Sequence, residues 1–140
     1  MVDFIIDANI LMSILISGKA SYRPILTYHR FVAPDFIFLE IEKYSSIILE
    51  KTKLNEEEFK KWSYFVFSQI RTFPRYILSE DIIHKSNKLL KNIDPKDASY
   101  VALSIELNLV LLTRDDILYK GLRKKGFRKV MKFDDFLRNI

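Results

Sequence analysis

The sequence predicts an α/β fold of three layers, in which a central parallel β-sheet is flanked by helices. Short apolar runs alternate along the chain with longer segments whose apolar residues recur at helical spacing. Strands that alternate with helices are joined by crossovers, so neighbouring strands run parallel and helices cover both faces of the sheet. The chain has 140 residues, 49% of them hydrophobic, and we expect residues 1–140 to form a single domain with a substantial core.

The first half of the chain is expected to contain two strands and three helices. Gly18 favours the end of the first helix, and Ser21 is suited to cap the second. Pro34 is tolerated at the start of a third, long helix, because its missing N–H would have no partner there. In chain order, the expected elements are a strand at 2–6, helices at 8–16 and 22–29, a strand at 31–33 and a helix from 34 through 48.

The second half is expected to contain further alternating elements. Asn55 and Glu58 form a capping box that opens a helix, and Pro74 ends it. Gly126 is a typical helix terminator near the end of the chain. In chain order, the expected elements are a helix at 55–73, a strand at 76–78, helices at 79–90 and from 94 through 105, a strand at 109–112, a helix at 116–125, a strand at 128–131 and a helix from 134.

One of these helices carries an apolar stripe at helical spacing, made of Phe59, Trp62, Val66 and Ile70. We interpret this stripe as core packing. The alternative interpretation is an exposed interface for a second copy of the chain or for a partner helix.

Composition narrows the classes of function. The net charge of +5 favours encounter with polyanions such as nucleic acids. The absence of cysteine excludes disulfides, thiolate zinc sites and a cysteine nucleophile. No apolar stretch approaches the length of a membrane span, and no signal segment opens the chain, so we expect a cytoplasmic protein without membrane contact.

Acidic residues follow two of the predicted strands. Asp7 comes directly after the apolar run at 2–6, and Asp115 comes soon after the run at 109–112. Ligands of parallel α/β sheets bind outside the carboxyl ends of the strands, so both acids are expected at one edge. Asp7 is also suited to cap the following helix, but we favour a metal ligand. Asp115 is the preferred ligand over its neighbour Asp116, which we interpret as a helper or a helix cap.

Two further acids are candidates for the same edge. Asp97 lies in the first turn of a predicted helix, where the helix dipole also favours a carboxylate without any ligand role. Glu40 and Glu42 compete for the last place, and they face nearly opposite ways on a helix. Glu40 shares an apolar, inward-looking stripe, and an acid on such a face needs a reason to be there. We therefore choose Glu40.

Carboxylates gathered at one edge repel one another unless a cation lies between them. Oxygen donors without soft partners suit Mg²⁺ or Mn²⁺, so the pattern indicates a metal-dependent phosphodiesterase. Asn9 and Thr113 are placed to support the ligands, and Arg114 and Lys96 are candidates for contact with a substrate phosphate. His29 and His84 are isolated from the acids, and we interpret them as ordinary helix residues.

Four segments, in this order, carry the acids along essentially the whole chain: Ile-Ile-Asp-Ala-Asn-Ile-Leu at 5–11, Leu-Glu-Ile at 39–41, Asp-Pro-Lys-Asp-Ala-Ser-Tyr-Val-Ala-Leu at 94–103 and Leu-Thr-Arg-Asp at 112–115. Together they resemble the PIN-domain nucleases. The resemblance implies a PIN-like fold, Mg²⁺ or Mn²⁺ as cofactor, and a catalytic ligand set of Asp7, Glu40, Asp97 and Asp115.

The same resemblance implies an endoribonuclease that cuts single-stranded RNA. Many small prokaryotic members are similar to VapC-type toxins, which implies an antitoxin partner and a homodimer. The alternative function is a catalytically silent module of the same fold that binds RNA or a partner. Two rival families fit the sequence less well. A receiver domain would need a lysine after a late strand, and a haloacid-dehalogenase-type phosphatase would need an aspartate where this chain has Asn9.

Overall fold

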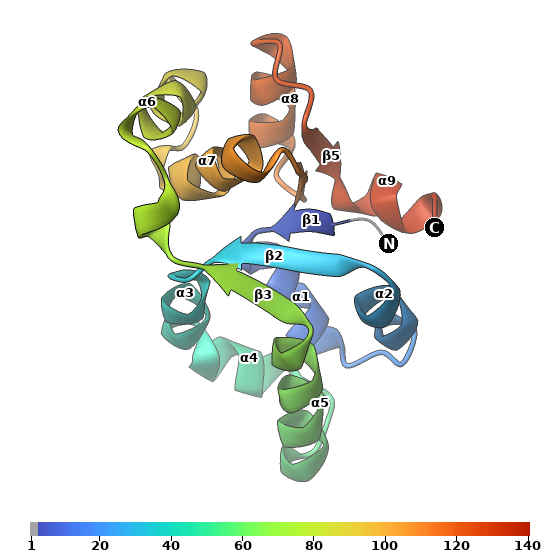
Figure 1. The fold of residues 1–140 in the computed structure, drawn as a ribbon. Coiled ribbons are helices and arrows are strands. Elements are labelled where there is room, and N and C mark those ends of the chain that lie inside the picture. The colour runs from blue at the N-terminus through green and yellow to red at the C-terminus, as the bar shows by residue number, and fades with distance from the viewer. Residues whose placement is uncertain (1–2) are drawn as a thin grey trace.

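The computed structural model describes residues 3–140 and contains a five-stranded parallel sheet within them, with the strand order β3-β2-β1-β4-β5 (Figure 1). The predicted α/β class with a parallel sheet is therefore confirmed. Val2, which we placed in the first strand, lies outside the described residues. The strands are β1 (Asp3–Ile6), β2 (Arg30–Pro34), β3 (Ile70–Phe73), β4 (Val110–Thr113) and β5 (Val130–Lys132).

Helices cover both faces of the sheet and complete the three layers (Figure 1). Helix α1 packs against α3, α4 and α5 on one face, whereas α7 packs on strands β1, β2 and β4 and against α6. Within residues 3–140, no helix has the length and apolar character that crossing a membrane requires. The helices are α1 (Ala8–Ser17), α2 (Tyr22–Tyr28), α3 (Ile37–Lys43), α4 (Ser45–Lys51), α5 (Glu56–Ser68), α6 (Glu80–Leu89), α7 (Ala98–Leu107), α8 (Asp116–Lys124) and α9 (Phe133–Arg138), with 3₁₀ turns η1 (Arg75–Ile77) and η2 (Pro95–Asp97).

The central strand β1 fixes where a site can form. It pairs in parallel with β2 on one side and with β4 on the other, so the direction of winding reverses between β1 and β4. Ligands of open parallel sheets bind at such a switch point, outside the carboxyl ends of the strands. Ile6 pairs with Leu112, which places the residues that follow, Asp7 and Thr113, side by side at this edge.

The sequence prediction was wrong between residues 69 and 78, although the capping box of Asn55 and Glu58 opens α5 as expected. The expected helix at 55–73 ends at Ser68, and Ile70–Phe73 forms strand β3 instead. Helical spacing extends to Ile70, but pairing of Ile70–Phe73 with β2 overrides it. The expected strand at 76–78 is instead the 3₁₀ turn η1 followed by a short connection.

The long helix expected from 34 through 48 was also wrong. Pro34 closes strand β2, and the segment that follows folds as two helices, α3 and α4. They meet at Tyr44, whose φ of −105° and ψ of 14° lie outside the α-helical range. The change of direction there allows Ile41 and Ile48 both to be buried. The other predicted elements differ from the structure by a few residues at their ends, as helix and strand boundaries commonly do.

The apolar stripe on α5 packs into the core, as we expected. Trp62 and Val66 are buried, and the indole Nε1 of Trp62 donates a hydrogen bond to the carbonyl oxygen of Ile14 over 3.0 Å. This bond satisfies the only polar atom of the indole and ties α5 to α1.

Candidate active site

Asp7 is the most constrained of the acids at the carboxyl edge. Its side chain is 6% exposed, and its Oδ1 accepts a hydrogen bond of 3.0 Å from the backbone N–H of Ile10, so it caps α1. Its Oδ2 accepts a 3.3 Å hydrogen bond from the hydroxyl of Thr113, which is fully buried at the end of β4. Burial raises the pKa of Asp7 to about 6, and the charges of Glu40 and Asp115 add to the effect, although both hydrogen bonds lower the pKa.

Asp97 lies beside Asp7 at the junction of η2 and α7. It is 8% exposed, and its Oδ2 has no hydrogen-bond partner among the described residues. Burial raises its pKa to about 7, and repulsion from Asp7, Asp94 and Asp115 contributes, whereas Lys96 lowers it. An unpaired buried carboxylate oxygen is costly, and in native structures such an atom commonly marks a functional role or a bound ion.

Glu40 and Glu42 occupy different environments. Glu40 is half-buried, faces the same pocket as Asp7 and accepts a 2.7 Å hydrogen bond on Oε1 from the hydroxyl of Tyr100. Glu42 is exposed on α3. The stripe used to choose Glu40 is less inward-looking than expected, because Tyr44 and the neighbouring Ile47 are 43% and 42% exposed.

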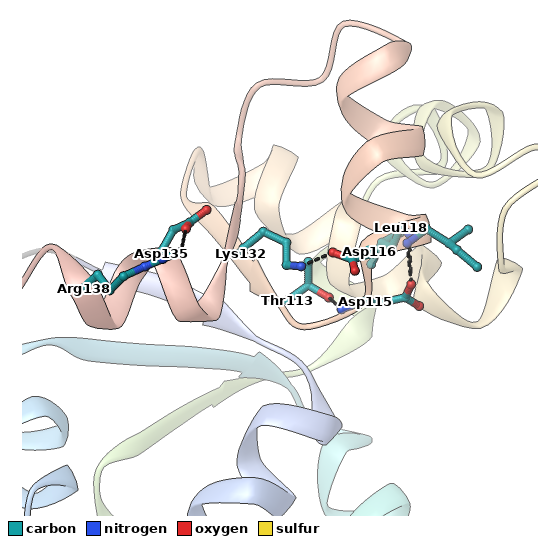
Figure 2. Close-up of polar contacts among 8 residues, drawn as sticks. Thr113, Asp115, Asp116, Leu118, Lys132, Asp135 and Arg138 are labelled. Atoms are coloured by element: carbon teal, nitrogen blue, oxygen red, sulfur yellow. Dashed lines mark hydrogen bonds and ion pairs between the residues drawn. The ribbon is translucent and has the colours of Figure 1, made fainter.

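Asp115 and Asp116 point in different directions (Figure 2). The Oδ1 of Asp115 caps α8, because it accepts hydrogen bonds from the N–H groups of Ile117 and Leu118 over 2.9 and 3.1 Å. Asp116 instead forms an ion pair with Lys132 of β5, and the hydrogen bond from this lysine lowers the pKa of Asp116. The charge of Asp115 contributes to the raised pKa values of Asp7 and Asp97, but Asp115 does not line the pocket that contains Asp7, Glu40 and Asp97.

The two basic residues expected near the substrate, Lys96 and Arg114, also occupy different places. Lys96 lines the pocket and forms an ion pair with Asp94, with 3.3 Å between Nζ and Oδ2. Arg114 does not line it. Its guanidinium lies 5.2 Å above the ring of Phe133 and donates a 2.9 Å hydrogen bond to the hydroxyl of Ser13 on α1.

Asp7, Glu40 and Asp97 line a pocket of about 310 Å³, which we call the acid pocket. Two lysines and three aromatic rings line it as well. Among the described residues, no three acidic or histidine side chains already stand as a ligand set for one ion. The acid pocket is lined by Asp7, Ala8, Asn9, Phe36, Glu40, Lys43, Tyr44, Lys96, Asp97 and Tyr100.

A family model described as PIN domain matches residues 5–133, which span β1 through the start of α9. The chain belongs to the PIN domain family. This PIN domain is also similar to the crystal structure of PAE2754 from Pyrobaculum aerophilum, with a TM-score of 0.67 and 15% sequence identity over 99% of this chain and 94% of that chain. No curated protein sequence matches it significantly. The similarity supports the fold, and PIN domains are generally nucleases, so the fold is of a nuclease type.

The acids of this PIN domain suit a hard divalent cation. The donors in the acid pocket are carboxylate oxygens, the ligands that Mg²⁺ and Mn²⁺ prefer. The Oδ2 of Asp97 has no hydrogen-bond partner among the described residues, and burial, with repulsion among the acids as a secondary cause, raises the pKa values of Asp7 and Asp97. A cation between these carboxylates would pair with that oxygen and offset the repulsion.

Sequence reasoning missed three polar residues of the acid pocket. Tyr100 lies three residues after Asp97 on the buried face of α7, a spacing that could have indicated its place beside the acids. Burial and the hydrogen bond to Glu40 raise the pKa of Tyr100, so its hydroxyl stays a donor and orients that carboxylate. Lys43 and Tyr44 reach the pocket because the chain turns at the break between α3 and α4, which the sequence did not reveal.

Proposed function

We propose that this PIN domain is a divalent-metal-dependent ribonuclease that hydrolyses phosphodiester bonds of single-stranded RNA. One observation carries the proposal: the buried Oδ2 of Asp97 has no hydrogen-bond partner, and it shares a pocket with Asp7 and Glu40. Protein interiors rarely leave such an atom unpaired. A site that holds Mg²⁺ or Mn²⁺ supplies the missing partner.

In this proposal Asp7, Glu40 and Asp97 hold the metal, and Asp115 contributes from the end of the neighbouring strand. Mg²⁺ or Mn²⁺, when bound, supplies Lewis acidity and charge stabilisation at the scissile phosphate. The hydrogen bonds from Ile10 and Thr113 fix the carboxylate of Asp7, and the hydroxyl of Tyr100 fixes that of Glu40. Fixed ligands matter because the groups that orient them tune metal affinity.

The walls of the acid pocket support a phosphate-bearing substrate. Lys43 and Lys96 line it and offer cationic partners to phosphate oxygens, and Asn9 adds an exposed amide. The volume of about 310 Å³ is at the small end of ligand pockets and leaves room for a small group such as a phosphate or a single nucleotide. The net charge of +5 favours encounter with RNA in general.

The PIN-like segments at 5–11 and 94–103 are the sole basis for a proposal about biological context. We propose a cytoplasmic VapC-type toxin that forms a homodimer and is held inactive by an antitoxin. The mass of the purified protein in solution tests the dimer, and release of cleavage when a copurifying protein is removed tests the antitoxin.

The decisive experiment incubates purified protein with end-labelled single-stranded RNA in Mg²⁺, Mn²⁺ or EDTA. We expect cleavage only with metal. Glu40→Gln should abolish it, whereas Glu42→Gln, the same change on the exposed side of the same helix, should not. This pair separates loss of the site from loss of the fold and from a contaminating nuclease.

Intact RNA under every metal condition would contradict the proposal. Binding of RNA without cleavage would then favour the silent module of the same fold. Cleavage that survives EDTA or the Glu40→Gln change would contradict the assigned site.

A further inference from the structure

A second pocket, of about 330 Å³, lies beside α1 and differs in charge from the acid pocket. We call it the basic pocket. Four basic side chains line it without any acidic residue, and none of the four forms an ion pair within residues 3–140. The basic residues are Lys19, Lys51, Lys53 and Arg114.

Packing between two loops brings two of these lysines together. Gly18 ends α1 in the left-handed conformation, with a φ of 59°, and the side chain of Leu54 packs directly against it. A Cβ at Gly18 would come within 2.7 Å of that side chain, so the close approach requires glycine. Lys19 follows Gly18 and Lys53 precedes Leu54, which places these two cations at the same pocket without a compensating acid.

Arg114 also lines the basic pocket, and its side chain is held in place. Its guanidinium lies above Phe133 and donates to Ser13, whose own hydroxyl donates to the carbonyl oxygen of Asn9 over 3.0 Å. Arg114 also follows Thr113 directly at the carboxyl end of β4. The arginine therefore connects the edge that carries the acids to the basic pocket.

A polar stripe on α1 joins the two pockets. Asn9, Ser13 and Ser17 are spaced by four residues, so they lie on one face of the helix. Asn9 lines the acid pocket, and both serines line the basic pocket. Each four-residue step advances about 6 Å along the helix, a span that a few nucleotides of an extended strand would cover.

Ser17 adds an independent sign of a missing ligand. Its hydroxyl oxygen is buried and has no hydrogen-bond partner among the described residues, although it borders the basic pocket. A hydroxyl beside four cations is well suited to donate to an anionic oxygen. The charge of the pocket and the unpaired hydroxyl thus indicate the same class of ligand.

We propose that the basic pocket binds a backbone phosphate of the same RNA strand whose scissile bond lies at the acid pocket. The strand passes along the polar face of α1 between the two pockets. The choice of RNA rests on the function proposed above. The binding of a strand phosphate by Lys19, Lys51, Lys53, Arg114 and Ser17 does not depend on cleavage.

The test measures binding of a fluorescein-labelled, 12-nucleotide single-stranded RNA in EDTA, which keeps the strand intact, over a range of salt concentrations. Losing one phosphate contact lowers the slope of log K against log salt by about 0.7 and weakens binding about fivefold at 0.1 M salt. We expect at least this effect from Lys51→Ala/Lys53→Ala. The matched control, Lys85→Ala/Lys124→Ala, removes two exposed lysines from α6 and α8 and should leave the slope unchanged.

Ser17→Ala supplies a second measurement, which a purely electrostatic attraction between the protein and RNA would leave unchanged. It removes a donor to phosphate without changing net charge, so affinity should fall at least about tenfold, as expected for a hydrogen bond to a charged group, while the salt slope stays constant. Thermal unfolding of each variant verifies that it folds.

Equal losses in the lysine pair and its control would overturn the proposal, because only the general basic field would then bind RNA. The proposal would also be overturned if neither the lysine pair nor its control changes RNA affinity. It would likewise be overturned if the lysine pair weakens binding of a glutamate-rich peptide but leaves RNA affinity unchanged. Wild-type protein that binds RNA through this pocket but cleaves none with metal would contradict the proposed nuclease and leave the basic pocket supported.

Discussion

The acid pocket and the first turn of α8 both carry aspartates at the carboxyl edge of the sheet, but their charges are compensated differently. At α8, Asp115 accepts two backbone N–H groups, and Asp116 pairs with Lys132 (Figure 2). In the acid pocket, Asp7 has two hydrogen bonds, and the Oδ2 of Asp97 has none among the described residues. The pKa follows this difference, since it is raised for Asp7 and Asp97 and lowered for Asp116.

This difference separates acids that stabilise the folded state from acids that destabilise it. An ion-paired aspartate such as Asp116 has its charge compensated by the protein itself, so its presence needs no ligand. A buried carboxylate without a partner destabilises the native chain, and in native structures such a group commonly marks a functional site. On this criterion Asp97 is the acid most specific to function, and Asp116 is the least.

The largest expected effect separates these two aspartates by activity. Asp97→Asn keeps the shape of the side chain but removes a proposed metal ligand, so metal-dependent RNA cleavage should fall at least about 100-fold, more than loss of a group that only orients a ligand. Asp116→Asn removes an exposed ion pair of little energetic worth, and cleavage should stay within about twofold. Gel-based rates at saturating metal measure both. Equal losses would remove the distinction between the two regions.

The next effect concerns stability and pH in the absence of metal. The pKa values of Asp7 and Asp97 rise from 3.8 to about 6 and about 7 on folding. A raised pKa stabilises the folded state fully below pH 3.8, and this contribution is lost as pH rises through 6 and 7. Between pH 5 and 8 these groups should therefore lower the free energy of unfolding, and Asp97→Asn should recover about 1–3 kcal/mol at pH 8.

Urea unfolding of wild type and Asp97→Asn in EDTA, at pH 5 and pH 8, measures this recovery. A variant that is less stable than wild type at pH 8 would show that the Asp97 carboxylate has a stabilising partner in the folded protein.

Metal binding should offset the same repulsion. A ligand at ten times its Kd stabilises the folded state by about 1.4 kcal/mol, which raises the Tm by about 3–6 °C in a chain of this size. Mn²⁺ should raise the Tm of wild type, and EDTA should reverse the rise. Asp7→Asn should show no rise, and a rise equal to that of wild type would contradict the assignment of Asp7.

The smallest effect sharpens the role of Tyr100. Tyr100→Phe removes the hydrogen bond to Glu40, a loss of about 0.5–1.5 kcal/mol, or about a 2- to 12-fold decrease in kcat/KM. Because the hydroxyl positions a ligand, a higher metal concentration should restore most of the activity. A loss that does not respond to metal concentration would indicate that the hydroxyl contacts the substrate itself.

The sequence predicted the sheet edge better than the pocket walls. Asp7 follows a run that is apolar at nearly every position, as a strand buried on both faces requires, so its place at a strand end could be inferred from local pattern. Strand β3 could not, because Ile70 fits helical spacing and only its pairing with β2 makes it a strand. Propensity is local, whereas this pairing joins distant segments.

Local sequence pattern also could not reveal whether each acid is buried, hydrogen-bonded or ion-paired. Asp97 in a first helical turn fits a dipole-stabilised surface acid as well as a ligand. Its burial depends on Asp7 and Tyr100 reaching the same pocket from β1 and α7. The choice between Asp115 and Asp116 likewise depends on Lys132, which only the pairing of β4 with β5 brings near.

Calorimetric titration of the metal-free protein with Mn²⁺ at pH 7.5, for wild type, Asp97→Asn and Asp116→Asn, compares the two regions most directly. We expect wild type and Asp116→Asn to bind with the same affinity, and Asp97→Asn to bind at least about tenfold more weakly. Unchanged Mn²⁺ affinity in Asp97→Asn, or a loss confined to Asp116→Asn, would contradict the proposal that the acid pocket is the metal site.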